Sequence, residues 1–136
     1  MLIPLVEKEL AYYAESINKN INNISILISY SAGIDSSVLL DIAYKLQSKY
    51  LFILSIAHLN HNSNHRSNEM EVFANQQSFE KSATLHLEQA YFNKSNFEAN
   101  ARSYRYTWLN RLKEKYSYDF ILTAHHYDDQ LETIEM

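Results

Sequence analysis

The feature of the sequence that most constrains the fold is an alternation of short apolar runs with longer amphipathic segments. Strands are predicted for residues 24–30, 52–57, 84–88 and 119–124, of which 84–88 is the weakest. Helices are predicted for residues 4–18, 36–49, 67–82 and 95–115, and another is predicted to begin with Asp128. Short, continuous apolar runs are typical of buried parallel strands. The alternation therefore favours an α/β fold class, with a parallel sheet covered by helices on both faces.

The predicted helix over residues 95–115 carries two local signals. Ser95 is followed three positions later by Glu98, which is the pattern of a capping box at a helix N-terminus. Tyr104, Trp108 and Leu112 recur at a spacing of four residues. They are expected to form the stripe with which this helix packs against the sheet.

Polar clusters follow three of the predicted strands. SAGIDS follows the first strand, HLNH follows the second and AHHYDD follows the fourth. Ligands of parallel α/β sheets bind beyond the carboxyl ends of the strands, so clusters at that edge are expected to share one site. The agreement between the three clusters is stronger than any one of them alone.

The chain contains one glycine, Gly33, and no cysteine. A single glycine excludes GxGxxG, the Walker loop GxxxxGK[ST] and the nucleophile elbow GxSxG, which each need at least two. The position of Gly33 inside the first cluster indicates a special backbone requirement there. The lack of cysteine removes disulfides, thiolate metal sites and a cysteine nucleophile, and it fits a reducing cytoplasm.

The net charge and the N-terminal residues narrow the class of protein further. The net charge of −4 gives no general attraction to nucleic acid, so any contact with RNA must be local. The first residues lack the basic start of a signal peptide, and no segment is long enough to span a membrane. A cytoplasmic protein with no membrane partner is expected, with the oligomeric state left open, a homodimer included.

The first polar cluster has the order of a phosphate-binding loop, with a strand, then small residues, then a helix. Backbone amides and the hydroxyls of Ser31, Ser36 and Ser37 can converge on one anion at the helix N-terminus. Asp35 fits such a loop if Mg²⁺ lies between its carboxylate and the phosphates, because hard cations bind both kinds of oxygen. The alternative is an ordinary turn with Ser36 as the helix N-cap.

The second cluster contains His58, His61 and His65. Zinc is one interpretation, but the segment has no helical register and offers no cysteine. Polar contacts to a nucleotide or to RNA at the end of the strand are favoured over zinc. An exposed polar loop without a ligand is the remaining alternative.

Arginines gather in the segment NFEANARSYRYTWLNR. Arg102 and Arg105 are three residues apart and share a helix face, and Arg111 lies further along. Their planar guanidinium groups suit phosphate oxygens, whereas a solvated basic face is the alternative.

Acidic residues gather at the end of the chain. Asp128, Glu132 and Glu135 fall on one face of the last predicted helix, with Asp129 beside them. Like charges at this spacing cost about 0.2–0.5 kcal/mol per pair unless a cation lies between them. A second cation site, for a metal or an ammonium group, is therefore one interpretation.

The clusters together resemble those of the PP-loop ATP pyrophosphatase superfamily and, within it, the tRNA(Ile)-lysidine synthetases. The resemblance covers about residues 22–136 and rests on ISYSAGIDSSVLL, IAHLNH, ANARSYRYTWL and ILTAHHYDDQLET, in that order. The first motif is typical of the superfamily, and the last two are more specific. The resemblance implies a Rossmann-like adenine-nucleotide α-hydrolase domain over residues 22–136, preceded by an N-terminal helix within residues 1–21.

The resemblance implies an ATP- and Mg²⁺-dependent ligase. Such enzymes transfer AMP to the wobble cytidine of isoleucine tRNA with a CAU anticodon and release pyrophosphate, and free L-lysine then displaces AMP to give lysidine. The implied ATP-binding residues are Ser31, Ala32, Gly33, Ile34, Asp35, Ser36, His58 and His61. The implied catalytic residues are Asp35, Asp129, Glu132, Arg102 and Arg105, of which Asp35 and Asp129 are the implied metal ligands.

The implied roles divide by charge. Asp129 and Glu132 would contact the ammonium groups of lysine or a second metal ion. Arg102 and Arg105 would face phosphate or the carboxylate of lysine. The two histidines of HLNH would border the nucleotide or the cytidine.

The chain departs from the superfamily in two ways. Its loop normally reads SGGxDS, and here Ala32 takes the place of the first glycine. A methyl group there costs on the order of 1 kcal/mol if the position needs a positive φ, and nothing if it does not. The chain also stops within the last predicted helix, after four strands, so an N-terminal piece without the tRNA-binding domains is expected.

Two alternatives stay open. One is another PP-loop enzyme, such as a tRNA thiolase or an amide-forming synthetase, although a thiolase normally carries cysteines in its catalytic region. The other is a nucleotide-binding module without catalysis, similar to a stress-protein domain, which would not need Asp35 together with the late carboxylates.

Overall fold

The computed structural model describes residues 2–62, 66–92, 95–124 and 131–134. The helices are α1 (Leu2–Ser16), the short 3₁₀ helix η1 (Ile21–Asn23), α2 (Ile34–Tyr50), α3 (Arg66–Lys81) and α4 (Phe97–Tyr116). The strands are β1 (Ser25–Ser29), β2 (Ile53–Asn60), β3 (Thr84–Gln89), β4 (Phe120–Ala124) and β5 (Leu131–Ile134). Every helix and strand predicted before Asp128 is present, with small shifts at its ends. Among the described residues, no helix is long and apolar enough to cross a lipid bilayer.

All strands lie in one sheet of order β3-β2-β1-β4-β5. Strands β1 to β4 are parallel, which confirms the predicted α/β fold. The chain adds β2 and β3 on one side of β1 and then crosses back to place β4 on the other side. The carboxyl ends of β1 and β4 therefore flank a topological switch point, which is where sheets of this class bind ligands.

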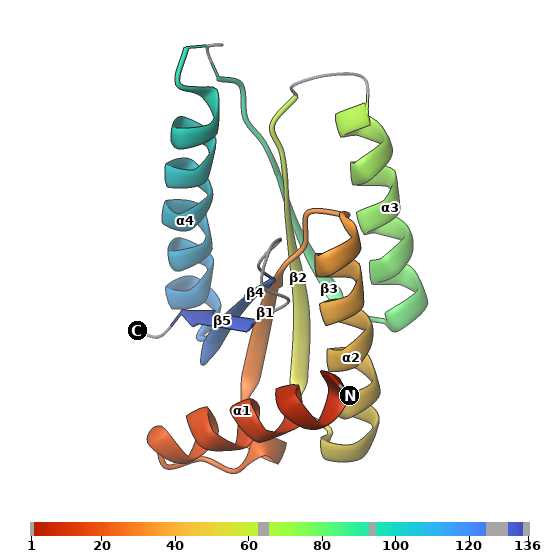
Figure 1. Ribbon diagram of the computed structural model, residues 1–136, viewed down its shortest axis with the longest axis vertical. Coiled ribbons are helices and arrows are strands. Elements are labelled where there is room, and N and C mark those ends of the chain that lie inside the picture. Colours follow the sequence, from red (N-terminus) through yellow and green to blue (C-terminus); the bar gives the residue numbers. More distant parts are fainter. Residues whose placement is uncertain (1, 63–65, 93–94, 125–130, 135–136) are drawn as a thin grey trace.

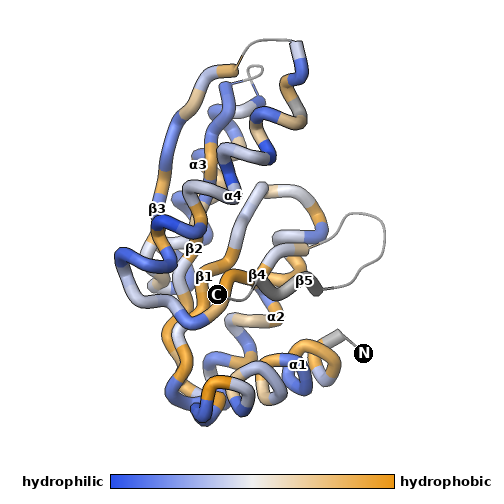
Figure 2. The backbone as a smooth tube through the Cα atoms, turned by 90° about the vertical axis from the view of Figure 1, so that its left-hand side faces the viewer, coloured by the Kyte–Doolittle hydropathy of each residue, from blue (hydrophilic) through white to orange (hydrophobic). Residues whose placement is uncertain are grey.

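Residues of β1 alternate between two cores on opposite faces of the sheet. Ile26 and Ile28 belong to the larger cluster, with α1 and α2, whereas Leu27 packs with Trp108 and Leu109 of α4. Figure 1 shows α2 and α3 on one side of the sheet and α4 on the other. Figure 2 shows hydrophobic segments along β1 and β4, in the middle of the molecule.

The start of α4 differs from the prediction, but its packing does not. Trp108 is buried, and Tyr104 and Leu112 pack against the same cluster, which confirms the predicted stripe. The predicted capping box is wrong, because the N-cap is Asn96 rather than Ser95. The backbone at the N-cap is left-handed (φ 54°), a conformation that asparagine tolerates, and no side-chain cap hydrogen bond forms.

The helix predicted from Asp128 is wrong for residues 131–134. They form β5, which pairs antiparallel with β4 so that Ile134 lies opposite Ile121. Thr133 and Ile134 are β-branched and favour a strand. The pairing also gives partners to the backbone groups on the outer edge of β4, which would otherwise be unpaired. The sheet thus has its four predicted parallel strands and an antiparallel edge strand that the sequence pattern did not indicate.

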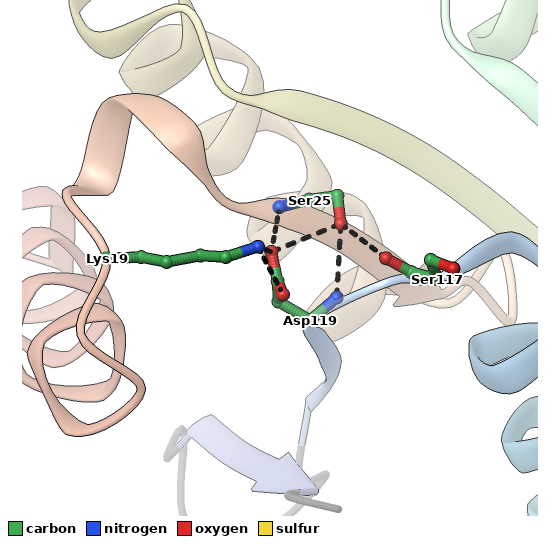
Figure 3. A network of polar contacts seen from close by, with 4 residues as sticks. All are labelled: Lys19, Ser25, Ser117 and Asp119. Carbon is green, nitrogen blue, oxygen red and sulfur yellow. Dashed lines mark hydrogen bonds and ion pairs between the residues drawn. The ribbon is translucent and has the colours of Figure 1, made fainter.

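The amino end of the sheet is held by a network that joins segments far apart in the sequence (Figure 3). The Asp119 carboxylate accepts hydrogen bonds from the backbone N–H of Ser25 at 2.8 Å and from the Lys19 ammonium group at 3.0 Å. The Ser25 hydroxyl lies 3.1 Å from the carbonyl oxygen of Ser117. The backbone N–H of Asp119 donates to the Ser25 carbonyl at 2.8 Å. Every polar group in this network has a partner from the protein itself.

Candidate functional site

The loop between β1 and α2 lies at the switch point and has an unusual backbone. Ala32 adopts a left-handed conformation with φ 68°, whereas Gly33 is extended with φ −80° and ψ 175°. The backbone requirement inferred for Gly33 therefore falls on Ala32, at a cost of about 1–2 kcal/mol. The Ala32 methyl group packs against the larger core cluster, which helps to hold it there. At Gly33 a Cβ atom would lie 3.3 Å from the Ser31 hydroxyl oxygen, so a larger residue there would require that side chain to shift by a few tenths of an ångström.

The three serine hydroxyls of the loop are engaged with the protein itself. The hydroxyls of Ser31 and Ser36 lie 3.0 Å apart, and the N–H of Gly33 donates to the Ser31 hydroxyl at 3.3 Å. The Ser37 hydroxyl lies 3.2 Å from the Tyr30 hydroxyl. These bonds fix the shape of the loop. Ser36 is not the helix N-cap, since that position is taken by Gly33.

A hollow of about 300 Å³ lies against this loop. We call it the loop hollow; its lining residues are Ser31, Gly33, Ile34, Asp35, Ser36 and Ala124. The amides of Ile34, Asp35 and Ser36 belong to the first turn of α2, where backbone N–H groups have no intrahelical acceptor. The positive end of the helix dipole lies at the same place. The loop hollow therefore suits an anion.

The half-buried side chain of Asp35 borders the same hollow. One carboxylate beside an anion site suits Mg²⁺, which binds proteins through one or two carboxylates together with phosphate oxygens and water. Among the described residues no group of three His, Cys, Asp or Glu side chains could hold a metal by itself. The donor set fits a metal ion that arrives with a polyphosphate.

Next to the loop, His58 is fixed by the backbone of the same loop. Strand β2 extends to Asn60, so His58 is a strand residue, 3% exposed, and not part of a polar loop as predicted. Its Nδ1 atom lies 2.7 Å from the carbonyl oxygen of Tyr30. A carbonyl only accepts, so Nδ1 carries the proton and Nε2 of the neutral ring is a bare acceptor. Burial lowers the pKa of His58 and favours this neutral form.

His58 opens into a cavity of about 50 Å³, which we call the imidazole cleft. Its lining residues are Ser29, Tyr30, Ser31, Ala57, His58, Leu59, Asn60, His61, Ser67, Met70, Ala101, Arg105 and Trp108. Ser31 borders both this cleft and the loop hollow, so the two are adjacent. Within the described part of the chain, the buried side-chain nitrogens without a partner are Nε2 of His58 and Nδ1 of His61. Burial and the nearby Arg105 charge lower the pKa of His61 as well.

A polar network supports the rim of the cleft. Asn60, 1% exposed, donates to the Glu71 carboxylate at 2.9 Å and accepts from the backbone N–H of Asn62 at 2.9 Å. The hydrogen bond from Asn60 holds the pKa of Glu71 below its usual value. This network fixes the chain where it leaves β2 and thereby positions the imidazole cleft.

The two predicted arginines are placed differently. Arg105 is half-buried and lines the imidazole cleft, whereas Arg102 is exposed. Both guanidinium groups lie near the ring of Tyr106, at 5.8 Å and 5.4 Å respectively. Of the two, only Arg105 borders the imidazole cleft.

Most of the acidic residues at the end of the chain lie outside the residues that the structure describes. Asp128 and Asp129 lie outside the described residues. Glu132 lies in β5, opposite Thr123 of β4. Their predicted roles stay predictions, and the helix face that was expected to group them does not exist at Glu132.

Sequence reasoning missed the aromatic and polar wall of the cleft. Tyr30 and Trp108 were assigned to a strand and to a core stripe, yet both also line the cleft. Asn60 is the centre of the supporting network. The signal that could have found Asn60 is its position two residues after His58, since residues at that spacing share a face of a strand.

A family model described as PP-loop domain matches residues 6–136. The chain therefore belongs to the PP-loop domain family, as its sequence motifs predicted. The curated tRNA(Ile)-lysidine synthase of Streptococcus equi subsp. equi (strain 4047) is 35% identical over 112 residues, covering 82% of this chain and 26% of that protein. The protein of the same name from Streptococcus mutans serotype c is 31% identical over 81% of this chain and 26% of its own length. The predicted resemblance is confirmed, and the chain spans about a quarter of these relatives.

A solved structure shares the fold. It is the U34-tRNA thiolase NcsA from Methanococcus maripaludis with its 4Fe-4S cluster, matched with a TM-score of 0.66 and 18% identity over 90% of this chain and 45% of that one. The likeness concerns the fold alone. The present chain contains no cysteine that could ligate such a cluster.

Proposed function

We propose that the full-length protein joins lysine to the wobble cytidine of isoleucine tRNA with a CAU anticodon, using ATP. AMP would first pass to the cytidine with release of pyrophosphate, and free L-lysine would then displace AMP. The observation that carries this proposal is a strand–loop–helix junction at the switch point whose first-turn amides and Asp35 border one hollow. The substrates are inferred from the lysidine synthase relatives, which are 31–35% identical over about four fifths of the chain.

The loop hollow would hold the phosphates that leave as pyrophosphate. Amides at a helix N-terminus stabilise the charge that develops on a departing phosphate and need no rearrangement to do so. Asp35 would hold Mg²⁺, which would supply further neutralisation of the polyphosphate charge. Since transfer at phosphorus depends mainly on positioning and charge neutralisation, this loop is expected to contribute most of the catalysis.

Other residues would act on the remaining groups. Arg105 would reach a phosphate or the lysine carboxylate from the imidazole cleft, and Arg102 would act from the exposed face of α4. Asp129 and Glu132 would bind the ammonium groups of lysine or a second metal.

Replacement of the Asp35 carboxylate tests the centre of the proposal. In full-length protein with ATP, lysine and tRNA, Asp35→Asn should lower pyrophosphate release at least about 100-fold, because one interaction with the reacting charge is lost. The matched control is Asp41→Asn, which changes an acid on the same helix whose side chain is 59% exposed. Unchanged turnover in Asp35→Asn would remove the metal-bridging role of this carboxylate.

Mass spectrometry of the tRNA tests the substrates. The gain of one lysyl group on an anticodon cytidine is expected. A gain of sulfur instead would identify a thiolase, and release of pyrophosphate without any change in the tRNA would point to another acceptor.

A further inference from the structure

The inference concerns the imidazole cleft, and it rests on the proposed use of nucleotide substrates. His58 and His61 both line this cleft, and each has a buried ring nitrogen, Nε2 and Nδ1 respectively, without a hydrogen-bond partner among the described residues. A buried acceptor without a partner lowers the stability of the folded protein, and native proteins keep such groups where a ligand or water completes them. A donor group of a bound ligand would complete each of these nitrogens, as an ordered water would in the absence of a ligand.

The chemistry of the missing group follows from the tautomer of His58. The Tyr30 carbonyl oxygen holds the proton on Nδ1, so Nε2 presents a lone pair and can only accept. A carbonyl or phosphate oxygen at this place would meet that lone pair and be repelled. The ligand must therefore bring an N–H or O–H group.

The charge and size of the cleft narrow the ligand further. Burial and the positive charge of Arg105, which lines the cleft, both lower the pKa of His61, so an ammonium group is disfavoured there despite Glu71 behind the rim. A volume of about 50 Å³ is far below that of a complete ligand site and accepts one functional group. An uncharged amine on the edge of a flat ring meets both conditions.

We propose that Nε2 of His58 accepts a hydrogen bond from the exocyclic amine of a nucleobase, so that the imidazole cleft selects an amino-bearing base. The adjacent loop hollow, which shares Ser31 with the cleft, would hold the phosphates. The amine has two sources within the proposed reaction, which are the adenine of ATP and the cytosine of the tRNA.

Two pairs of nucleotides separate these sources. ITP differs from ATP, and UMP from CMP, by a carbonyl oxygen in place of the amine. Calorimetric titration of the full-length protein with Mg²⁺ should show a preference of about fivefold or more for the amino member of one pair. A preference for ATP over ITP assigns the cleft to adenine, and a preference for CMP over UMP assigns it to cytosine.

Two variants of His58 test whether the preference comes from Nε2. The amide of His58→Asn can replace Nδ1 and donate to Tyr30, but it leaves the Nε2 position without an acceptor. His58→Gln extends further and can return an oxygen to the Nε2 position. The preference for the amino-bearing nucleotide should vanish in His58→Asn and be retained at least in part in His58→Gln. If His58 acts only through its hydrogen bond to Tyr30, His58→Asn should instead be the more stable of the two variants in urea and the more similar to the wild-type protein.

Controls separate this inference from the proposed function. Binding of inorganic pyrophosphate with Mg²⁺ should be the same in all three proteins, because it involves only the loop hollow. Failure of pyrophosphate and ATP to bind the wild-type protein would contradict the proposed function, while the CMP and UMP pair would still test the cleft. An amine preference that survives in His58→Asn, or its absence from both pairs, would overturn the inference.

Discussion

The two ends of the sheet are built on opposite principles. At the amino end, Asp119 joins Lys19, Ser25 and the segment before β4, and each polar group has a protein partner. At the carboxyl end, Ala32 is held in a left-handed conformation, and two imidazole nitrogens are buried without partners in the described residues. The amino end, whose polar groups are all paired, contributes stability. The carboxyl end gives up stability, and we propose that its unpaired nitrogens serve to bind a ligand.

The chain tolerates backbone strain at Ala32, at the carboxyl end of the sheet. Residue Ala32 and its neighbours lie between β1, which is completely buried at Ile26 to Ile28, and the long helix α2. A rigid strand and helix on either side fix both ends of the loop. The cost at Ala32 is small beside the burial of these elements, so the loop keeps its shape before any ligand arrives.

The largest expected effect on stability lies at the amino end. Asp119→Ala should lower the free energy of unfolding by about 2 kcal/mol, because the backbone N–H of Ser25 loses its carboxylate acceptor. Urea unfolding of the full-length protein measures this, with ATP affinity as the second readout. Lys19→Ala is the matched control and should cost less than about 1 kcal/mol, since this ion pair is partly exposed. A large loss of ATP affinity in Asp119→Ala without loss of stability would contradict the division of roles between the two ends.

A smaller effect is expected when the strained position is changed. Ala32→Val should cost about 1–2 kcal/mol and weaken ATP binding, because a β-branched residue is strongly disfavoured in the left-handed region. Ala32→Gly should change stability by less than about 1 kcal/mol, since the relief of strain is offset by greater freedom of the unfolded chain and loss of the packed methyl group. Equal stability of the valine and glycine variants would show that the backbone is not left-handed at this residue in solution.

The smallest effect is expected from mild acidification. Burial lowers the pKa of His58, His61 and His86 in the folded protein below the usual 6.5. The unfolded chain then binds more protons, so stability should be complete above about pH 6.5 and should fall as the pH drops through that value toward the folded pKa values. Urea unfolding at pH 7.5 and at pH 5.5 measures the loss. It should be smaller in His58→Gln, and an equal loss in that variant would show that His58 is not buried as a neutral base.

The pH range in which the histidines change the stability of the protein is separate from the range in which the carboxylates do so. Hydrogen bonds from Lys49 and Asn60 lower the pKa values of Glu7 and Glu71 respectively. Stability from these groups is present above their unfolded pKa of 4.5 and is lost only as the pH falls below it. Measurements above pH 5 therefore report mainly on the histidines.

Much of the fold and the centre of the site could be predicted from the sequence. Apolar runs and helical spacing gave the strands and helices before Asp128, and the position of SAGIDS after β1 placed the loop and Asp35 at the switch point. The strand at Leu131–Ile134 could not be predicted, because its pairing depends on the open edge of β4 and not on its own pattern. The accepting nitrogen of His58 could not be predicted either, since it depends on contact with Tyr30, which is distant in the sequence.

The sequence by itself determined the layered sheet, the loop beside it and the family, because these depend on local spacing and on residue types that neighbouring positions share. Tertiary structure alone decided which backbone position carries the left-handed strain, which arginine borders the cleft and which imidazole nitrogen is left without a proton. Those properties arise where segments far apart along the chain meet, and a burial or a hydrogen bond between such segments leaves no periodic trace in the sequence.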